Sequence, residues 1–326
     1  MTGLRLGFLG VGWIGRQRME AMIATGLVES VVIADPVPEM AKEAARIAPG
    51  AKLVGTLDGL LGLGVDGVAI ATPSAMHAGQ SLRALEAGAA VFCQKPLGRT
   101  VAETVAVVEA ARVADRLLCV DLSYRFTQGM RKIRELARSG ALGRIHAADL
   151  VFHNAYGPDK DWFYDPAFSG GGCVIDLGVH LVDLALWTLD FPAVTEISAK
   201  LLARGRPLRE GEVEDYVVAT LALASGAVVR IACSWRLPAG CDAKISASFY
   251  GTEGGAALRN VDGGFHQFIA ERYRGTTRET IASPPDDWGG RAAADWVRRL
   301  AEGARFDPEA ERLVDVAGIL DRIYGR

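Results

Sequence analysis

The sequence lacks several features that place a protein in a specialised class. Its five cysteines are odd in number and include no C-x-x-C pair, so they cannot close into a complete set of disulfides. A reducing cytosol is therefore the expected compartment. No long run of one charge sign occurs, and 36 Lys and Arg stand against 39 Asp and Glu, a net charge of -3. This balance leaves no excess of positive charge that would attract a nucleic-acid backbone or an anionic membrane, so neither is an expected partner.

The sequence has two long apolar runs, and each resembles a membrane-targeting segment but carries residues that argue against that interpretation. The N-terminal LRLGFLGVGWIG resembles the core of a signal peptide, but it holds four glycines and has only Arg5 before it. The stretch CVIDLGVHLVDLALWTL (173–189) resembles a spanning helix. It carries Asp176, His180 and Asp183, each of which is costly in hydrocarbon. We therefore expect a cytoplasmic protein with no membrane contact.

What the sequence does contain is a regular alternation in its first 122 residues. Short apolar or β-branched runs alternate with Ala-rich helical segments, which is typical of a parallel sheet with crossover helices. The predicted strands are 4–9, 30–35, 51–54, 67–72, 89–94 and 116–121. The predicted helices are 16–26, 38–48, 77–88 and 100–115. Residues 1–122 are therefore predicted to form an α/β domain with a doubly wound sheet.

The remaining residues, 123–326, read differently and predict a second, α+β domain. After a helix at about 127–139, most runs alternate or are continuously β, as in IHAADLVFH and AKISASFYGTEGGAAL, and ASG at 224–226 is a short hairpin connection. A large, mixed and mostly antiparallel sheet is expected. The predicted helices in this part are 172–188, 290–302 and 308–323, and the last two are candidates to pack back on the first domain.

A glycine motif lies between the first strand and the first helix. GFLGVGWIG holds Gly10, Gly12 and Gly15 in G-x-G-x-x-G spacing. The first glycine would make the tight turn, the second would admit a pyrophosphate, and the third would allow close helix packing. The helix start, with Trp13 and Ile14, would then face the phosphates. Such a triplet is weak evidence alone, because glycine turns often only bend the chain.

An acidic residue strengthens this interpretation. Asp35 ends the second strand, twenty residues beyond Gly15, where its carboxylate could accept hydrogen bonds from the adenosine ribose. The alternative is that Asp35 caps the helix that begins near Pro36 to Pro38. No Arg follows to pair with a 2′-phosphate, so the pattern favours NAD over NADP.

Polar residues follow the fourth and fifth strands. Thr72, Pro73 and His77 belong to ATPSAMH, and Lys95 and Pro96 belong to CQKPLG. The carboxyl ends of parallel strands border the ligand crevice, so these residues should line it. A lysine at a strand end is often only a solvated side chain. A cis Lys95–Pro96 bond would instead turn the chain and aim the ammonium into the crevice.

The stretch SGGGCVIDLGVH places Asp176 and His180 four residues apart, hence on one face of a helix. The glycines Gly170–Gly172 would let a cofactor or substrate approach the helix start, or would form a flexible entry loop. One alternative makes His180 a core histidine bonded to Asp176 or Asp183. The functional alternative needs a partner, and Lys95 supplies one.

These residue types suit the oxidation of an alcohol. A hydride leaves or reaches carbon, and a second group must handle the hydroxyl proton; an imidazole, with an ordinary pKa of ~6.5, does so near neutrality. His180 is the predicted acid or base. Lys95 would hold the reacting oxygen, and Asp176 would orient the imidazole or bind a neighbouring substrate hydroxyl.

The motifs together resemble the Gfo/Idh/MocA family of glucose-fructose oxidoreductase and inositol dehydrogenase-like enzymes, nearly end to end. The likeness lies in GFLGVGWIG, ATPSAMH, QKPL, YRF, GGGCVIDLGVH and YGTEGG. It implies a Rossmann domain joined to an open-faced sheet that often mediates oligomerisation, a sugar or polyol substrate, and Lys95, Asp176 and His180 as site residues. Arg125 resembles the family's substrate-side residue. The departure is Gln94, where the family's commonest residue is Glu.

Three functional hypotheses follow. The first is an NAD-dependent dehydrogenase of a sugar, polyol or sugar derivative. The second is a non-catalytic dinucleotide-binding sensor or regulator of the same fold, and the third an enzyme whose tightly held cofactor never leaves. No metal-ligand spacing occurs, so we predict no catalytic metal. The exposed sheet face predicts a homo-oligomer, a dimer or tetramer.

Two features of the second domain stay open at this stage. His153 is either a strand residue or a substrate contact. The loop NAYGPDKDWFYD, with Tyr156, Trp162 and Phe163, would stack on a sugar ring or fill a domain interface, and we favour the interface.

Overall fold

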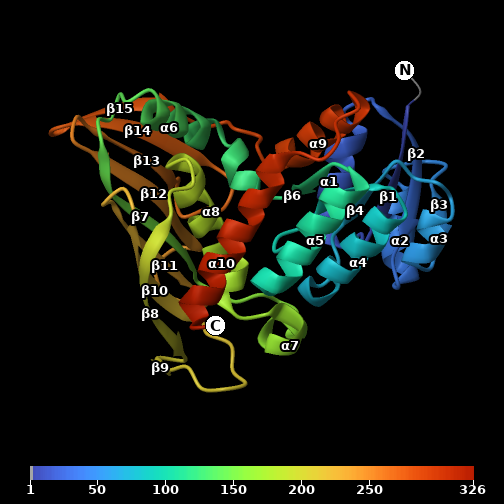
Figure 1. Cartoon of the computed structure of the whole chain (residues 1–326), viewed down its shortest axis with the longest axis horizontal. Helices are drawn as coiled ribbons and strands as arrows, with labels where there is room; N and C mark the ends of the chain where they lie inside the picture. Colours follow the sequence, from blue (N-terminus) through green and yellow to red (C-terminus); the bar gives the residue numbers. More distant parts are fainter. Residues whose placement is uncertain (1–2) are drawn as a thin grey trace. The chain divides into compact units, whose positions relative to one another are not determined.

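The computed structural model describes residues 3–326, which divide into two compact units. The first unit runs to Ser123 and takes in Gly290–Val314, and the second consists of Tyr124–Gly289 and Asp315–Arg326. Each unit has its own sheet and its own apolar core (Figure 1).

The sheet of the first unit has six strands in the order β3-β2-β1-β4-β5-β6. Every neighbouring pair is parallel. The strands are β1 (Leu4–Leu9), β2 (Val28–Ala34), β3 (Lys52–Val54), β4 (Gly67–Ile70), β5 (Ala90–Cys93) and β6 (Leu118–Val120). The strand order reverses between β1 and β4, the switch point outside which ligands bind in such sheets. The predicted doubly wound fold is confirmed.

Five helices connect these strands: α1 (Trp13–Ile23), α2 (Pro38–Ala45), α3 (Leu57–Leu61), α4 (Ser74–Glu86) and α5 (Val101–Ala114). The later segment of this unit adds α9 (Arg291–Ala301) and the 3₁₀ turn η4 (Pro308–Glu311). The sequence did not predict α3, a five-residue helix whose cap is Thr56. Trp296 of α9 is fully buried in this unit, and its ring centroid lies 5.8 Å from that of Phe92.

The second unit contains a nine-stranded sheet in the order β15-β14-β13-β12-β7-β11-β10-β8-β9. Only β7 and β11 pair in parallel among these strands. The strands are β7 (Ile145–Asn154), β8 (Val194–Ala203), β9 (Arg206–Pro207), β10 (Tyr216–Leu223), β11 (Val228–Ser234), β12 (Ala243–Gly251), β13 (Gly255–Asn260), β14 (Phe268–Arg274) and β15 (Thr277–Ala282). The predicted mixed, mostly antiparallel sheet is confirmed. The strands β9, β14 and β15 were not predicted. The pattern of β9 and β15 is weak, because β9 is two residues long and β15 is largely exposed and polar.

One face of this sheet packs on helices and the other is open. Along β7, Ala148, Leu150 and Phe152 are buried, whereas the residues between them are partly exposed. Figure 1 shows α6 (Gln128–Arg138) and α8 (Val179–Thr188) along the covered face. All ten residues of α8 are buried. The other helical segments are η1 (Ser123–Phe126), η2 (Asp161–Tyr164), α7 (Pro166–Ser169), η3 (Val174–Gly178) and α10 (Arg312–Tyr324).

The helix predicted at 172–188 differs in its first turn. Residues Val174–Gly178 form a π-helical turn, and α8 continues from Val179 as an ordinary α-helix. Such turns are rare and occur often at functional sites.

The segment Pro166–Thr188 is long and apolar enough to cross a membrane by composition, but 94% of its most apolar window is buried inside the protein. Burial of this kind is typical of the core helix of a globular domain.

Candidate active site

The glycine turn after β1 has the geometry that the motif predicts. Gly10 has a φ of +79°, and a Cβ there would lie 2.8 Å from the backbone of Ala71. A Cβ on Gly15 would lie 2.2 Å from the Gly10 carbonyl oxygen, so α1 packs closely on the turn. Apart from its chain neighbours Val11 and Trp13, no atom of residues 3–326 lies within 4 Å of a Cβ built on Gly12, which is the N-cap of α1. Gly12 therefore faces open space at a helix N-terminus, where an anion is stabilised. Trp13, the next residue, is 63% exposed.

Asp35 binds the glycine turn directly. Its Oδ2 accepts a hydrogen bond from Val11 N at 2.8 Å, and its Oδ1 accepts one from Val37 N at 2.9 Å. The N-cap of α2 is Val37, with no side-chain cap, so the alternative that Asp35 caps this helix is wrong. Because a carboxylate has about four acceptor positions, Asp35 retains capacity for ribose hydroxyls.

His77 joins the two loops that follow β4 and β5. It is 1% exposed, and its Nδ1 and Nε2 lie 2.7 Å from the carbonyl oxygens of Pro96 and Thr72. Burial lowers the pKa of His77, while the two carbonyl groups oppose that shift. A cofactor contact through this ring would have to displace one of the bonds. Direct cofactor binding by His77 stays a prediction, whereas the contacts give the ring a positioning role.

Thr72 and Pro73 lie where the sequence places them, between β4 and α4. Pro73 is the N-cap of α4, and Thr72 Oγ1 donates to Gln80 Oε1 at 2.6 Å. Both residues are partly exposed at the carboxyl edge of the sheet, as is Ile14 in the first turn of α1.

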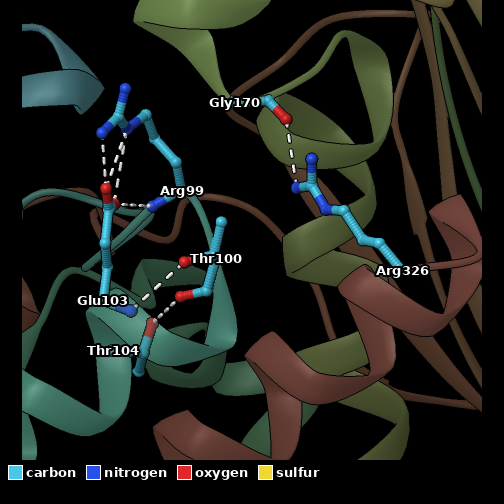
Figure 2. Close-up of polar contacts among 6 residues, drawn as sticks. All are labelled: Arg99, Thr100, Glu103, Thr104, Gly170 and Arg326. Carbon is cyan, nitrogen blue, oxygen red and sulfur yellow. Dashed lines mark hydrogen bonds and ion pairs between the residues drawn. The ribbon is translucent and has the colours of Figure 1, made fainter.

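The loop that carries Lys95 runs from the end of β5 to the start of α5. The Lys95–Pro96 peptide bond is cis, and Lys95 is half-buried. Downstream, Thr100 caps α5 by accepting a hydrogen bond from Glu103 N at 3.2 Å (Figure 2). The Glu103 carboxylate in turn accepts from Arg99 N at 2.7 Å and pairs with the Arg99 guanidinium. This is a capping arrangement that fixes the entry of α5.

Gln94, the departure from the family pattern, lies in a buried polar cluster. Its Nε2 donates to Asp121 Oδ2 at 2.7 Å, and Arg18 Nε donates to the same oxygen at 2.5 Å. Each of the three residues is at most 8% exposed. Among residues 3–326, no partner reaches Asp121 Oδ1. An amide at position 94 therefore matches the carboxylate of Asp121, a contact between residues 27 positions apart that no local pattern indicates.

In the second unit, Asp176 is the only residue between Gly171 and Thr188 that is not buried. Its Oδ2 accepts a hydrogen bond from Trp235 Nε1 at 3.0 Å. The rings of Phe163 and Tyr164 pack edge-on against Trp235, with centroid distances of 6.3 and 5.6 Å. The aromatic loop thus supports the residue that orients Asp176. Sequence reasoning missed Trp235, although an aromatic residue directly after a strand was a signal for it.

His180 lies deeper in the second unit, at 8% exposure. Its ring centroid is 4.9 Å from that of Tyr124, in an edge arrangement, and 6.5 Å from that of Phe152. A small apolar cavity of about 10 Å³, at most one water in size, adjoins these three rings. Asp183, which one alternative paired with His180, is bound by Arg125.

The pair of Arg125 and Asp183 is bidentate, with Asp183 buried and Arg125 half-buried. Arg125 Nε lies 2.9 Å from Asp183 Oδ2, and Arg125 Nη2 lies 2.5 Å from Oδ1. Burial raises the pKa of Asp183, and the adjacent guanidinium opposes that shift. The guanidinium also lies over the rings of Trp187 and Phe191. Much of its bonding capacity is used inside the unit, so a substrate contact by Arg125 stays a prediction.

His153 lies on the open face of the sheet. Phe152, its neighbour, points to the covered face near His180, and successive side chains of a strand alternate between faces. His153 Nδ1 contacts Ser234 Oγ at 2.8 Å, and its ring stacks on Tyr216. Of the two alternatives, these contacts favour the strand-surface one, and a substrate contact by His153 stays a prediction.

The predicted site residues are divided between the two units. Lys95 and the glycine turn belong to the first unit, and Asp176 and His180 belong to the second. In the described part of the chain, no three His, Cys, Asp or Glu side chains gather as a metal site would require.

Comparisons with known proteins agree with this arrangement of a dinucleotide fold and a mixed-sheet unit. Residues 4–122 match the oxidoreductase family with an NAD-binding Rossmann fold, and residues 130–257 match the GFO/IDH/MocA C-terminal domain. The two matches together cover most of the chain.

Individual relatives extend the match. D-glucoside 3-dehydrogenase of Escherichia coli K12 is 30% identical over 211 residues, which is 61% of this chain and 60% of that protein. Inositol 2-dehydrogenase of Acidothermus cellulolyticus is 29% identical over 94% of this chain and 87% of its own length. Among solved structures, GenD2 from gentamicin A biosynthesis, in complex with NAD, has a TM-score of 0.83 and 26% identity, covering 100% of this chain and 94% of its own.

These findings define an oxidoreductase whose first unit is an NAD-binding Rossmann domain. The chain belongs to the Gfo/Idh/MocA family.

Proposed function

We propose that this chain is an NAD-dependent dehydrogenase that oxidises a secondary hydroxyl of a sugar or polyol, or catalyses the reverse reduction. The first unit would bind the cofactor and the second the substrate. The observation that carries the proposal is the family match over both units, together with a lysine at 95, an aspartate at 176 and a histidine at 180. The relatives named above act, by their names, on glucosides and inositols.

The residues of the first unit fit a dinucleotide. Gly12 faces open space at the start of α1, so backbone N–H groups there are available to a pyrophosphate. Asp35 stands at the end of β2 with spare acceptor capacity, which suits the 2′- and 3′-hydroxyls of an adenosine ribose and opposes a 2′-phosphate. We therefore expect NAD rather than NADP.

The chemistry needs three tasks from the protein. A nicotinamide held by the first unit would supply the acceptor for the hydride of the hydroxyl-bearing carbon. His180 takes the hydroxyl proton as that hydride leaves, so a carbonyl product forms and the proton passes on to solvent. Lys95 donates to the reacting oxygen and stabilises its alkoxide-like charge. Asp176, oriented by Trp235, binds a neighbouring hydroxyl or orients the imidazole.

The test is a screen for NADH formation over inositols, hexoses, glucosides and sugar acids, run in parallel with NADP. We expect turnover with at least one polyol or sugar, and a higher kcat/KM with NAD. His180→Ala should lose turnover by a factor of about 10²–10⁴ and keep its affinity for NADH. NADH binding without turnover across the whole panel would instead support the sensor hypothesis. Full activity of His180→Ala would remove the assigned role.

Two further properties belong to the same proposal. We expect a dimer or tetramer formed through the open sheet face, where Val228 and Tyr250 are 45% and 38% exposed. A molar mass of one subunit by light scattering would contradict this. A cytoplasmic location is expected because all five cysteines are free thiols.

A further inference from the structure

The glycines Gly170–Gly172, which precede the helical segment that carries Asp176 and His180, lie close to other groups of the protein. Gly170 has a φ of +84°. A Cβ on Gly171 would lie 2.1 Å from the Tyr324 hydroxyl oxygen, and one on Gly172 would lie 1.9 Å from the Glu214 carbonyl oxygen. Glycine is therefore required at positions 171 and 172, because Tyr324 and Glu214 leave no room there for a side chain. The expectations of a ligand approach or a flexible entry loop are replaced by a packed junction.

Glu214 is the centre of this junction. It is 0% exposed, and both of its carboxylate oxygens lie 3.0 Å from Gly172 N. Oε1 also accepts from Val174 N at 2.9 Å, and the backbone oxygen of Glu214 accepts from Cys173 N at 3.0 Å. These N–H groups begin the turn that carries Asp176 and leads to His180. Burial raises the pKa of Glu214, and the donors that surround the carboxylate, which favour its ionised form, oppose that rise.

The last residues of the sequence complete the junction. Tyr324 donates its hydroxyl to Glu214 Oε1 at 2.8 Å. Arg326 Nη2 donates to Gly170 O at 3.2 Å, as Figure 2 shows, and its guanidinium lies over the Tyr324 ring at 4.7 Å. Segments more than 100 residues apart thus hold the first turn of one helix.

We propose that Glu214, supported by Tyr324, is a positioning residue that sets the π-helical turn so that Asp176 and His180 present the geometry needed for proton transfer. The inference rests on the proposed function. Neither residue needs to touch substrate. Loss of the carboxylate would let the turn relax towards other helical hydrogen-bond patterns, which would shift Asp176 relative to Trp235. Small displacements of reacting groups are costly to rate.

The experiment uses the full chain with two variants and one control. Glu214→Gln keeps the size of the side chain but turns an NH₂ donor towards the N–H groups. Tyr324→Phe removes a single hydroxyl from the same junction. Glu212→Gln is the matched control, because Glu212 lies two residues away, is partly exposed, and pairs with Arg206 and with the backbone of Arg209 outside the junction. Unfolding by urea is measured for all three.

We expect kcat to fall about 10-fold in Tyr324→Phe, the effect of about one hydrogen bond, and about 100-fold in Glu214→Gln. The KM for NAD should stay within about twofold, and the pH dependence of kcat should shift because the environment of the proton-transfer group changes. Amide exchange in residues 170–180 should accelerate in both variants. Glu212→Gln should match the wild type.

The outcomes separate the inference from the function on which it rests. If the wild type turns over and folded Tyr324→Phe and Glu214→Gln keep its kcat and pH profile, the inference alone is overturned. Loss of stability with an unchanged kcat in the folded fraction would have the same meaning, because it describes a purely structural anchor. A wild type with no turnover would overturn the proposed function, and with it the catalytic role of Glu214. Exchange rates then show separately whether the junction holds the turn. If Glu214→Gln does not fold, Tyr324→Phe decides.

Discussion

Trp235 donates its indole N–H to Asp176 across 3.0 Å, and so connects the end of β11 to the π-helical turn. Trp235 is 3% exposed, whereas Asp176 reaches the surface of the second unit. A buried donor therefore sets the orientation of a carboxylate that is accessible to a ligand.

Trp235→Phe tests this relationship. The substitution keeps an aromatic ring against Phe163 and Tyr164 but removes the donor to Asp176. We expect a loss of about 1 kcal/mol in the free energy of unfolding and a decrease of about 10-fold in kcat. Steady-state kinetics and urea unfolding measure the two effects. An unchanged kcat would mean that the orientation of Asp176 does not limit the reaction.

Substitution by alanine should weaken NADH binding at Gly12 and lower stability at Gly15. In the part of the chain that the structure describes, the added methyl of Gly12→Ala meets no atom within 4 Å beyond its chain neighbours, so the stability of this variant should stay within about 0.5 kcal/mol of the wild type. Its affinity for NADH should drop at least about 10-fold, because the methyl group occupies the space for the pyrophosphate.

Gly15→Ala is the control for this comparison. Its Cβ would lie 2.2 Å from the Gly10 carbonyl oxygen, so it should lose about 1–3 kcal/mol of stability. NADH fluorescence titration and urea unfolding distinguish the two variants. Wild-type NADH affinity in Gly12→Ala would contradict the assignment of the turn.

His77 should make stability depend on pH. Burial lowers its pKa in the folded chain below the ordinary value of 6.5, so the unfolded chain binds a proton more readily. The free energy of unfolding should therefore decrease as pH falls below about 6.5, through the window between the two pKa values. His77→Asn should remove this part of the pH dependence.

Urea unfolding at a series of pH values, compared between wild type and His77→Asn, measures the difference. Both ring nitrogens face carbonyl oxygens, which favour the protonated ring and limit the shift. A wild type that gains stability on acidification relative to His77→Asn would show that these bonds outweigh burial.

Gln94→Glu, which restores the commonest family residue, should destabilise this chain. A carboxylate at 94 would meet Asp121 with only Arg18 to compensate both charges in a buried site. We expect a loss of about 3–5 kcal/mol of stability at neutral pH. The double variant Gln94→Glu with Asp121→Asn exchanges the two groups and should recover most of it. A stable single variant would contradict this account of the departure.

Much of the fold followed from local pattern. The alternation of apolar runs and Ala-rich segments predicted the doubly wound sheet, and the glycine spacing predicted the turn before α1. The two alternatives for His153 could have been separated in the same way, since Ala148, Leu150 and Phe152 already mark the opposite face of its strand. Weakly patterned elements were missed: α3 is short, and β15 has four exposed residues at its start.

The sequence by itself determined the strongly patterned elements and their order, because helix and strand periods act over a few residues. It also placed Lys95 after the fifth strand and Asp176 and His180 on one helical segment. Only the tertiary structure showed why three glycines precede the site helix, what holds Asp176, and why an amide at 94 suits this chain. Each of those answers depends on Glu214, Trp235 or Asp121, residues brought close by strand register and packing across long stretches of sequence. Spacing along one element carries no information about such partners.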